Sequence, residues 1–188
     1  MTTSATLIGG FTDAPIQAAH AFRAAMTAMA RPGTIHDITG GQAPAPVSPA
    51  AATLLLTLCD AETPLCLAGA HDCEAVRAWV TFHTSAPFVA PEHAMFALGT
   101  WDALQPVDAF ATGTPEYPDR AATLIVDGAD LANAGSTLTG PGIRESIRFA
   151  LPDPAAFARN AARFPLGWDC YFTSGARLAA LPRSTRIG

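Results

Sequence analysis

Lysine is absent from the 188 residues of this chain, and all eleven basic side chains are arginine. A lysine amine is required for a Schiff base to pyridoxal phosphate, for the phosphate-loop motif and for a serine-lysine dyad. These three mechanisms are therefore excluded within this chain. The guanidinium groups that remain are planar forks of donors, which suit multiply charged oxyanions such as phosphates.

Charge is also scarce, since charged residues make up 14% of the chain against about a quarter in typical soluble domains. We therefore expect part of the surface to meet another protein, although genome base bias is an alternative cause of an alanine-rich, arginine-only composition. The net charge is -5 and no basic run occurs. Because phosphate backbones are held by clustered cations, a nucleic-acid partner is excluded.

The chain has no long apolar run either. No segment approaches the roughly 18 apolar residues of a membrane span. The N-terminus lacks a basic segment followed by an apolar stretch. We expect a cytoplasmic protein that does not contact the membrane. Residues 1–188 are interpreted as one domain, of which residues 1–10 are expected to lack fixed structure.

Motifs for metal binding are missing. The cysteines at positions 59, 66, 73 and 170 show no two-residue knuckle spacing. Reduced and mostly buried thiols, without a metal or an iron-sulfur centre, are expected. The run His71 to Glu74 superficially resembles a metal cluster, but adjacent residues at a helix start point in different directions. Capping, with Asp72 as the cap, and core packing explain this run better.

Motifs for independent catalysis are missing as well. No Gly-x-Ser-x-Gly elbow and no phosphate-loop or dinucleotide fingerprint occurs. His83 has a side chain suited to proton transfer, yet no partner for it is evident in the sequence. Its place near a helix end is more typical of a structural cap.

Helical and strand-like patterns alternate along the chain. Ile16, Ala19, Phe22, Met26 and Met29 recur every three or four residues, which predicts a helix that ends before Pro32 and Gly33. Further helices are predicted at 49–58, 72–82 and 152–163, and strands at 34–38, 65–67, 94–98, 122–126, 136–138, 143–149, 169–173 and 178–181. Trp79 and Phe82 are expected in the core. The mixture predicts an α/β fold with a mixed β-sheet sandwiched by helices.

Seven short strings carry a family resemblance through their order. They are Phe22-Arg23…Met26…Met29-Ala30-Arg31-Pro32-Gly33, Leu54-Leu55-Leu56-Thr57-Leu58…Asp60…Thr63-Pro64, Trp79…Phe82-His83-Thr84…Ala86-Pro87, Ala122-Thr123-Leu124-Ile125, Leu138-Thr139-Gly140-Pro141-Gly142-Ile143, Phe164-Pro165-Leu166-Gly167 and Leu181-Pro182-Arg183-Ser184-Thr185. In this order the strings resemble the PhnH family, a subunit of the bacterial carbon-phosphorus lyase system that degrades phosphonates.

The resemblance implies an accessory or structural subunit, which forms a homodimer and works with the other carbon-phosphorus lyase subunits. The step implied is the synthesis of ribose 1-phosphonate 5-triphosphate from ATP and a phosphonate. The family fold resembles that of pyridoxal-phosphate transferases, but without lysine no such cofactor is expected here.

Two other interpretations stay open. The first is a self-sufficient enzyme that binds a small phosphate or phosphonate at its homodimer interface. The second is an inactive descendant of a pyridoxal enzyme that retains only ligand sensing.

Four residues within the matching strings are candidates for binding an anion, namely a phosphonate or a ribosyl phosphate. Arg31 and Arg183 each stand beside a proline that restricts the local backbone. Gly140 and Gly142 are expected to offer unobstructed backbone N–H groups. The alternative is that the two arginines are turn and strand-end residues tied to acidic neighbours.

Overall fold

The computed structural model describes residues 8–188. The strands are β1 (His36–Asp37), β2 (Leu65–Leu67), β3 (Phe96–Gly99), β4 (Thr123–Asp127), β5 (Ser136–Thr139), β6 (Ile147–Phe149), β7 (Asp169–Ser174), β8 (Arg177–Leu181) and β9 (Arg186–Ile187). The helices are α2 (Ala14–Ala30), α3 (Pro49–Leu58), α4 (Glu74–Thr84) and α5 (Pro154–Ala161), with 3-10 turns η1 (Gly69–His71), η2 (Pro91–His93), η3 (Val107–Ala109) and η4 (Pro118–Arg120). The predicted α/β class is confirmed.

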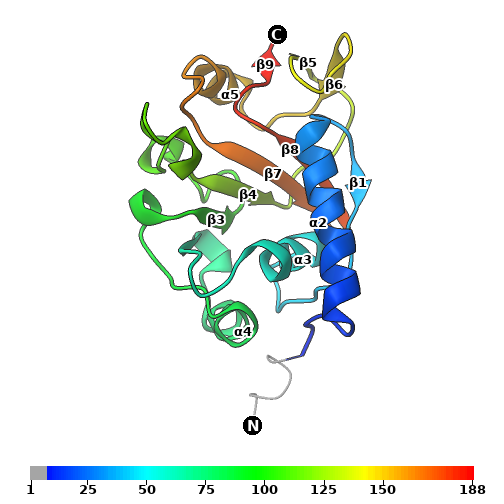
Figure 1. Cartoon of the computed structure of the whole chain (residues 1–188), viewed down its shortest axis with the longest axis vertical. Coiled ribbons are helices and arrows are strands. Elements are labelled where there is room, and N and C mark those ends of the chain that lie inside the picture. The colour runs from blue at the N-terminus through cyan, green and yellow to red at the C-terminus, as the bar shows by residue number, and fades with distance from the viewer. Residues whose placement is uncertain (1–7) are drawn as a thin grey trace.

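The main sheet is mixed, as predicted. Its strand order is β1-β8-β7-β4-β3-β2. Strands β2, β3, β4 and β7 are parallel, whereas β8 pairs antiparallel with both β7 and β1. A second, antiparallel sheet has the order β6-β5-β9, and Figure 1 shows it at the end of the molecule opposite α4.

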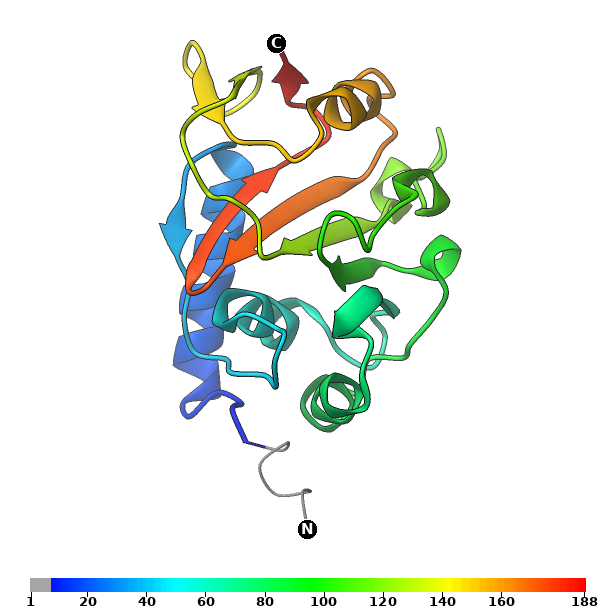
Figure 2. The ribbon, with the colours of Figure 1, turned by 180° about the vertical axis from the view of Figure 1, so that it is seen from behind.

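The inner strands are buried on both faces, which explains their continuous apolar sequences. In β4, Leu124 and Val126 join the core on one side of the sheet, while Ile125 joins the core on the other. Helices α2, α3 and α4 contribute to the core that contains Ile125 (Figure 1). Helix α5, the small sheet and connecting loops form the opposite core, and Figure 2 shows the segment between β4 and β5 running across that side.

The exposed face of α2 differs from the simplest interpretation of its sequence. Large apolar side chains recur along this helix, yet Ile16, Phe22 and Met26 are 56%, 52% and 53% exposed. The helix buries a face of small residues instead, including Ala21 and Ala25. Small side chains let the helix axis approach β8 and α3 closely, so packing overrides the preference for burying large side chains.

Helix α4 corrects two predictions. Asp72 is not its cap: Cys73 occupies that position, and the carboxylate of Asp72 pairs with the guanidinium of Arg77 at 3.0 Å. Trp79 is buried as expected, but Phe82 is 59% exposed. The helix is amphipathic: Trp79 lies on the face that packs against the core, whereas Phe82, three residues later, lies at the border of the solvent-exposed face.

Strand β6 is shorter than the predicted strand at 143–149. The chain from residue 140 to 146 forms bends and a turn before β6 begins at Ile147.

Of the four cysteines, Cys59, Cys66 and Cys170 are buried, as expected, and burial raises the pKa of Cys59 to about 12. The N-terminal residues 1–10 were expected to lack fixed structure, and residues 1–7 of this segment lie outside the described residues. Ile8 is described, and its carbonyl accepts a hydrogen bond from the Trp79 indole at 3.1 Å.

Candidate functional site

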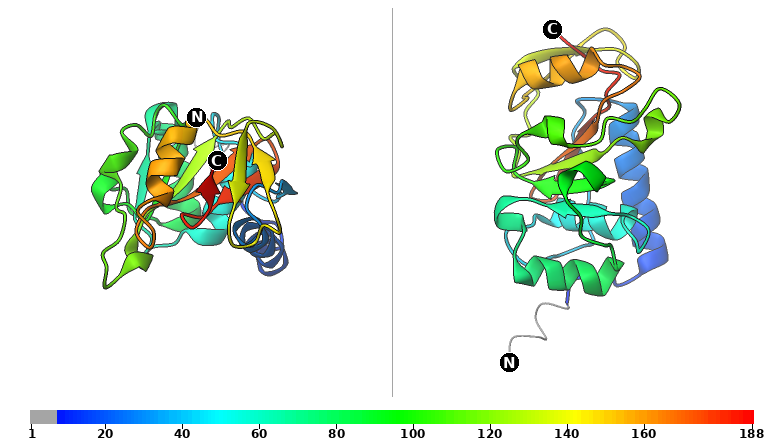
Figure 3. Two further views of the ribbon diagram at one scale, coloured as in Figure 1. Left: turned by 90° about the horizontal axis from the view of Figure 1, so that it is seen from above. Right: turned by 90° about the vertical axis from the view of Figure 1, so that its left-hand side faces the viewer.

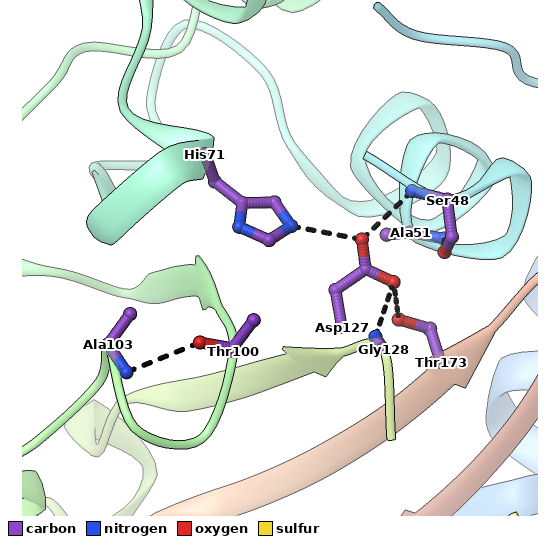
Figure 4. A network of polar contacts seen from close by, with 8 residues as sticks. All are labelled: Ser48, Ala51, His71, Thr100, Ala103, Asp127, Gly128 and Thr173. Atoms are coloured by element: carbon purple, nitrogen blue, oxygen red, sulfur yellow. Dashed lines mark hydrogen bonds and ion pairs between the residues drawn. The ribbon is translucent and has the colours of Figure 1, made fainter. Parts of the chain in front are cut away.

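Asp127 is a buried carboxylate at the carboxyl end of β4, 3% exposed. Its Oδ2 accepts a hydrogen bond from the backbone N–H of Ser48 at 2.8 Å and lies 3.1 Å from Nε2 of His71. Its Oδ1 accepts from the Thr173 hydroxyl at 2.8 Å and from the Gly128 N–H at 3.1 Å (Figure 4). The two oxygens thus have four partners from four segments.

The hydrogen bonds keep this carboxylate charged. Burial by itself raises the pKa of Asp127, but the hydrogen bonds from His71, Ser48 and Thr173 outweigh it and hold the pKa below its ordinary value. A carboxylate has about four lone-pair sites, all of which are used here. Asp127 therefore ties the start of α3 and the turn after β2 to the main sheet, and it has no spare acceptor for a substrate.

His71 is buried, as the sequence predicted, and only 3% of it is exposed. Figure 4 shows its ring directed toward the carboxylate of Asp127. Its Nδ1 has no hydrogen-bond partner among residues 8–188. Within the same residues, no three His, Cys, Asp or Glu side chains converge in a manner suited to a metal ion. The geometry points to packing and orientation of Asp127.

A pocket of about 380 Å³ lies beside this network, after the carboxyl ends of β3 and β4. Its lining comprises Thr100, Trp101, Asp102, Val126, Asp127, Gly128, Ala129, Asp130, Ala150, Leu151 and Pro152. Three of these residues are aspartates and none is basic. Trp101 is held in place by stacking on Phe157, with ring centroids 5.0 Å apart. Such a lining favours a ligand with hydroxyl or amino donors and disfavours a bare anion.

The glycine loop predicted from sequence lies between the two candidate arginine segments. A Cβ added to Gly142 would be 2.1 Å from the carbonyl oxygen of Ala30, next to Arg31. A Cβ added to Gly140 would be 3.2 Å from the carbonyl oxygen of Ser184. The fold therefore brings three segments of the predicted anion site together.

The two arginines differ in their partners. The Arg183 guanidinium forms a two-pronged contact with Asp169, at 2.7 and 3.2 Å, and also donates to the carbonyl of Pro118 at 2.6 Å. Arg31 is exposed, and its side chain makes no hydrogen bond or ion pair with any other described residue. Arg31 is thus available to a ligand, whereas Arg183 would have to share its donors.

His83 lies in the last turn of α4, as expected. Its ring centroid is 4.8 Å from that of Trp79 and 4.9 Å from that of Phe82. Gly10 packs against the ring so closely that an added Cβ would be 2.7 Å from it. These contacts agree with a structural role at the helix end.

The grouping of Ser48, His71, Asp127 and Thr173 was missed by sequence reasoning. One signal was available: His71 and Asp127 each follow a short apolar strand, and polar residues after parallel strands gather at one edge of the sheet. Using that signal requires knowing that β2, β4 and β7 are parallel, which the apolar patterns do not establish.

Comparison with known proteins identifies the family. The family model for "Bacterial phosphonate metabolism protein (PhnH)" matches residues 9–188. The chain belongs to the PhnH family. One curated relative is the alpha-D-ribose 1-methylphosphonate 5-triphosphate synthase subunit PhnH of Rhizobium meliloti (strain 1021), which is 38% identical over 191 residues, or 95% of this chain and 94% of the relative. The resemblance carried by the seven strings is confirmed and extends over nearly the whole chain.

Proposed function

We propose that this chain is the PhnH subunit of a bacterial phosphonate ribosyl-triphosphate synthase within the carbon-phosphorus lyase system. The observation that carries the proposal is the PhnH relative, whose name describes a synthase subunit and whose sequence aligns almost end to end. In that reaction the phosphonate displaces adenine from the ribose of ATP and becomes joined to the ribose triphosphate. This chain acts in it as an accessory subunit, together with other subunits.

The geometry of the charged residues supports an accessory role. The buried Asp127 has four internal partners, and Arg183 is engaged by Asp169. Groups with these partners hold the chain in shape and are poorly placed to transfer protons to a substrate. The function is then exerted by positioning partners or ligand in the assembly.

A homodimer is the second part of the proposal. Phe22 and Met26, four residues apart, form an exposed apolar pair on one face of α2. Ile16 adds a third exposed apolar side chain, roughly 120° around the helix from Phe22. A second copy can pack the same ridge against this one around a two-fold axis. Burial of Phe22 and Met26 would remove apolar surface that a monomer leaves in water.

The test is affinity purification of the tagged chain from its native host grown on a phosphonate, with mass spectrometry of co-eluting proteins and the native mass of the assembly. Recovery of the other phosphonate-pathway subunits at fixed stoichiometry is the expected result. A lone dimer, under conditions that preserve other complexes, would overturn the accessory role.

Phe22→Asp is expected to shift the purified chain from dimer to monomer, whereas Phe82→Asp, which alters an exposed phenylalanine on α4, should leave the dimer intact.

The ligand part of the proposal is a phosphonate or ribosyl phosphate held by Arg31, Arg183, Gly140 and Gly142. The proximity of the glycine loop to both arginine segments supports it. Arg31→Ala should weaken binding of a ribosyl phosphate, measured by titration calorimetry. Unchanged affinity and unchanged assembly activity in both Arg31→Ala and Arg183→Ala, with the fold intact, would remove this part.

A self-sufficient enzyme is the competing function, and the observation that favours it is the exposed Arg31 beside the glycine loop, whose guanidinium has no hydrogen-bond or ion-pair partner among the described residues. Turnover of ATP and phosphonate by the purified chain alone would establish it.

The remaining parts of the proposal are a cytoplasmic location, no pyridoxal-phosphate Schiff base and a fold like that of pyridoxal-phosphate transferases. No helix among residues 8–188 has the length and apolar content to span a bilayer.

A further inference from the structure

The small sheet has one apolar and one polar face. Its inner face contributes Leu138 and Phe149, both fully buried, to the core. Because side chains alternate along a strand, Thr137 and Thr139 of β5 point to the other face. Strands β6 and β9 flank β5 and have Arg148 and Arg186 on that outer face.

The register pairs each arginine with a threonine. Thr137 is opposite Arg148, and Thr139 is opposite Arg186. Direct cross-strand neighbours have Cβ atoms about 5 Å apart, so each hydroxyl lies within reach of a guanidinium. Neighbouring strands are about 4.8 Å apart, and the two arginines are offset by two residues along β5, so their backbones lie roughly 12 Å apart. Figure 3 shows this sheet with α5 at one end of the molecule.

These donors are available. Arg148 donates from Nε and one terminal nitrogen to the carbonyl of Gly135, at 3.3 and 3.1 Å, and contacts no carboxylate. The side chains of Arg186, Thr137 and Thr139 have no hydrogen-bond or ion-pair partner within the described part of the chain. By contrast, three other arginines pair with aspartates: Arg77 with Asp72, Arg163 with Asp108 and Arg183 with Asp169.

The polar face continues into the glycine loop. Thr139 leads directly into Gly140, and beyond Gly142 lies the exposed Arg31. The backbone N–H groups of Gly140 and Gly142 donate no hydrogen bond to another described residue. The connection to β6 also contains one carboxylate, Glu145, which is exposed and directly follows the exposed Arg144.

We propose that the outer face of the small sheet, formed by Thr137, Thr139, Arg148 and Arg186, binds the polyphosphate chain of a ribose triphosphate. Guanidinium forks and hydroxyl groups are donors that match phosphate oxygens. Two arginines on opposite sides of β5 match several linked phosphates better than a single phosphate group. The identity of the ligand as a ribose triphosphate rests on the proposed function, whereas the polyphosphate chemistry rests on the surface itself.

The experiment is titration calorimetry of the full chain with inorganic tripolyphosphate and with inorganic phosphate at low salt. Tripolyphosphate is expected to bind at least tenfold more tightly than phosphate. The double variant Arg148→Gln/Arg186→Gln should weaken tripolyphosphate binding at least tenfold. The matched control is Arg177→Gln, which removes an exposed arginine of the main sheet and should change affinity less than twofold.

Three results would overturn the proposal: no preference for tripolyphosphate, wild-type affinity in the double variant, or an equal loss in Arg177→Gln, which would indicate binding to overall charge. Arg186→Gln alone, which breaks no internal contact, tests the site if the double variant fails to fold. Loss of partner proteins from the double variant, without tripolyphosphate preference in the wild type, would assign the face to an acidic protein instead. If affinity purification of the wild-type chain recovers no partner proteins, the proposed subunit function is overturned, but the proposed binding of tripolyphosphate is not.

Discussion

Two polar regions of this protein differ in charge and in how their charges are satisfied. The pocket after β3 and β4 is lined by three aspartates and no basic residue. The outer face of the small sheet has two arginines that contact no carboxylate. At the first region the buried Asp127 uses its charge to join four segments, while at the second the donors remain open to a ligand.

Charge alone does not mark a binding site in this fold. A buried carboxylate must be hydrogen-bonded to remain charged, so its acceptors are consumed by the protein. An exposed arginine stays hydrated and needs no internal partner. The availability of donors and acceptors, rather than their number, separates the structural region from the proposed binding region.

Asp127→Ala should produce the largest effect, a loss of about 3–5 kcal/mol in the free energy of unfolding, because it leaves several buried donors without an acceptor. Urea unfolding at neutral pH measures it. Asp130→Ala is the matched control, since it removes an exposed aspartate from the same pocket and should leave stability unchanged within error. Equal losses of unfolding free energy in the two variants would show that the hydrogen bonds around Asp127 do not stabilise this edge of the main sheet.

Gly142→Ala is expected to cost about 3 kcal/mol, through a positive φ and a Cβ only 2.1 Å from a backbone oxygen. Gly128→Ala, in the pocket, is the control: φ is also positive, at +78°, but nothing lies within 4 Å of the added Cβ. Its cost should be about 1 kcal/mol, from backbone conformation alone. Thermal unfolding of both variants compares the packed glycine of one region with the open glycine of the other.

Arg183→Gln should destabilise the fold by about 1–2 kcal/mol, because it breaks a partly buried contact with Asp169. Arg186→Gln should leave stability unchanged and lower tripolyphosphate affinity instead. Chemical denaturation and calorimetry on the same two proteins measure both quantities. A stability loss in Arg186→Gln would contradict the inference that Arg186 serves ligand binding and not the fold.

Among these tests, lowering the pH should change the free energy of unfolding the least. The pKa of Asp127 is below its ordinary value in the folded state, so its charge stabilises the fold above the unfolded pKa of about 3.9 and this contribution is lost as pH falls through the folded pKa. The stability gap between wild type and Asp127→Asn should therefore narrow below about pH 4. A gap that stays constant down to the acid transition would show that charge contributes nothing at this position.

Local patterns predicted much of the fold. Helix α3 begins where Ser48 and Pro49 predict it, and the Ser48 hydroxyl accepts from the Ala51 N–H at 3.2 Å. The apolar runs at 122–126 and 178–181 became inner strands, with boundaries within one residue. These features depend on neighbouring residues, and neighbours are visible in a sequence.

The candidate site was predicted less completely. Gly140, Gly142 and Arg31 were singled out, and the fold does place their segments side by side. The partners of Arg183 were left open between a ligand and an acidic neighbour, and the structure supplies Asp169. Arg148 and Arg186 were overlooked, because only the register of β5 with its two neighbours brings them to one face.

The family, the α/β class, most of the strands and helices, and the absence of lysine chemistry all follow from the order and type of the residues. Which face of α2 is buried, and the contact between His71 and Asp127 across 56 positions of the chain, depend on the packing of distant segments. The physical reason is that hydrogen bonds and packing between distant segments depend on strand order and on the space left between elements. Neither quantity is encoded in any local pattern of residues.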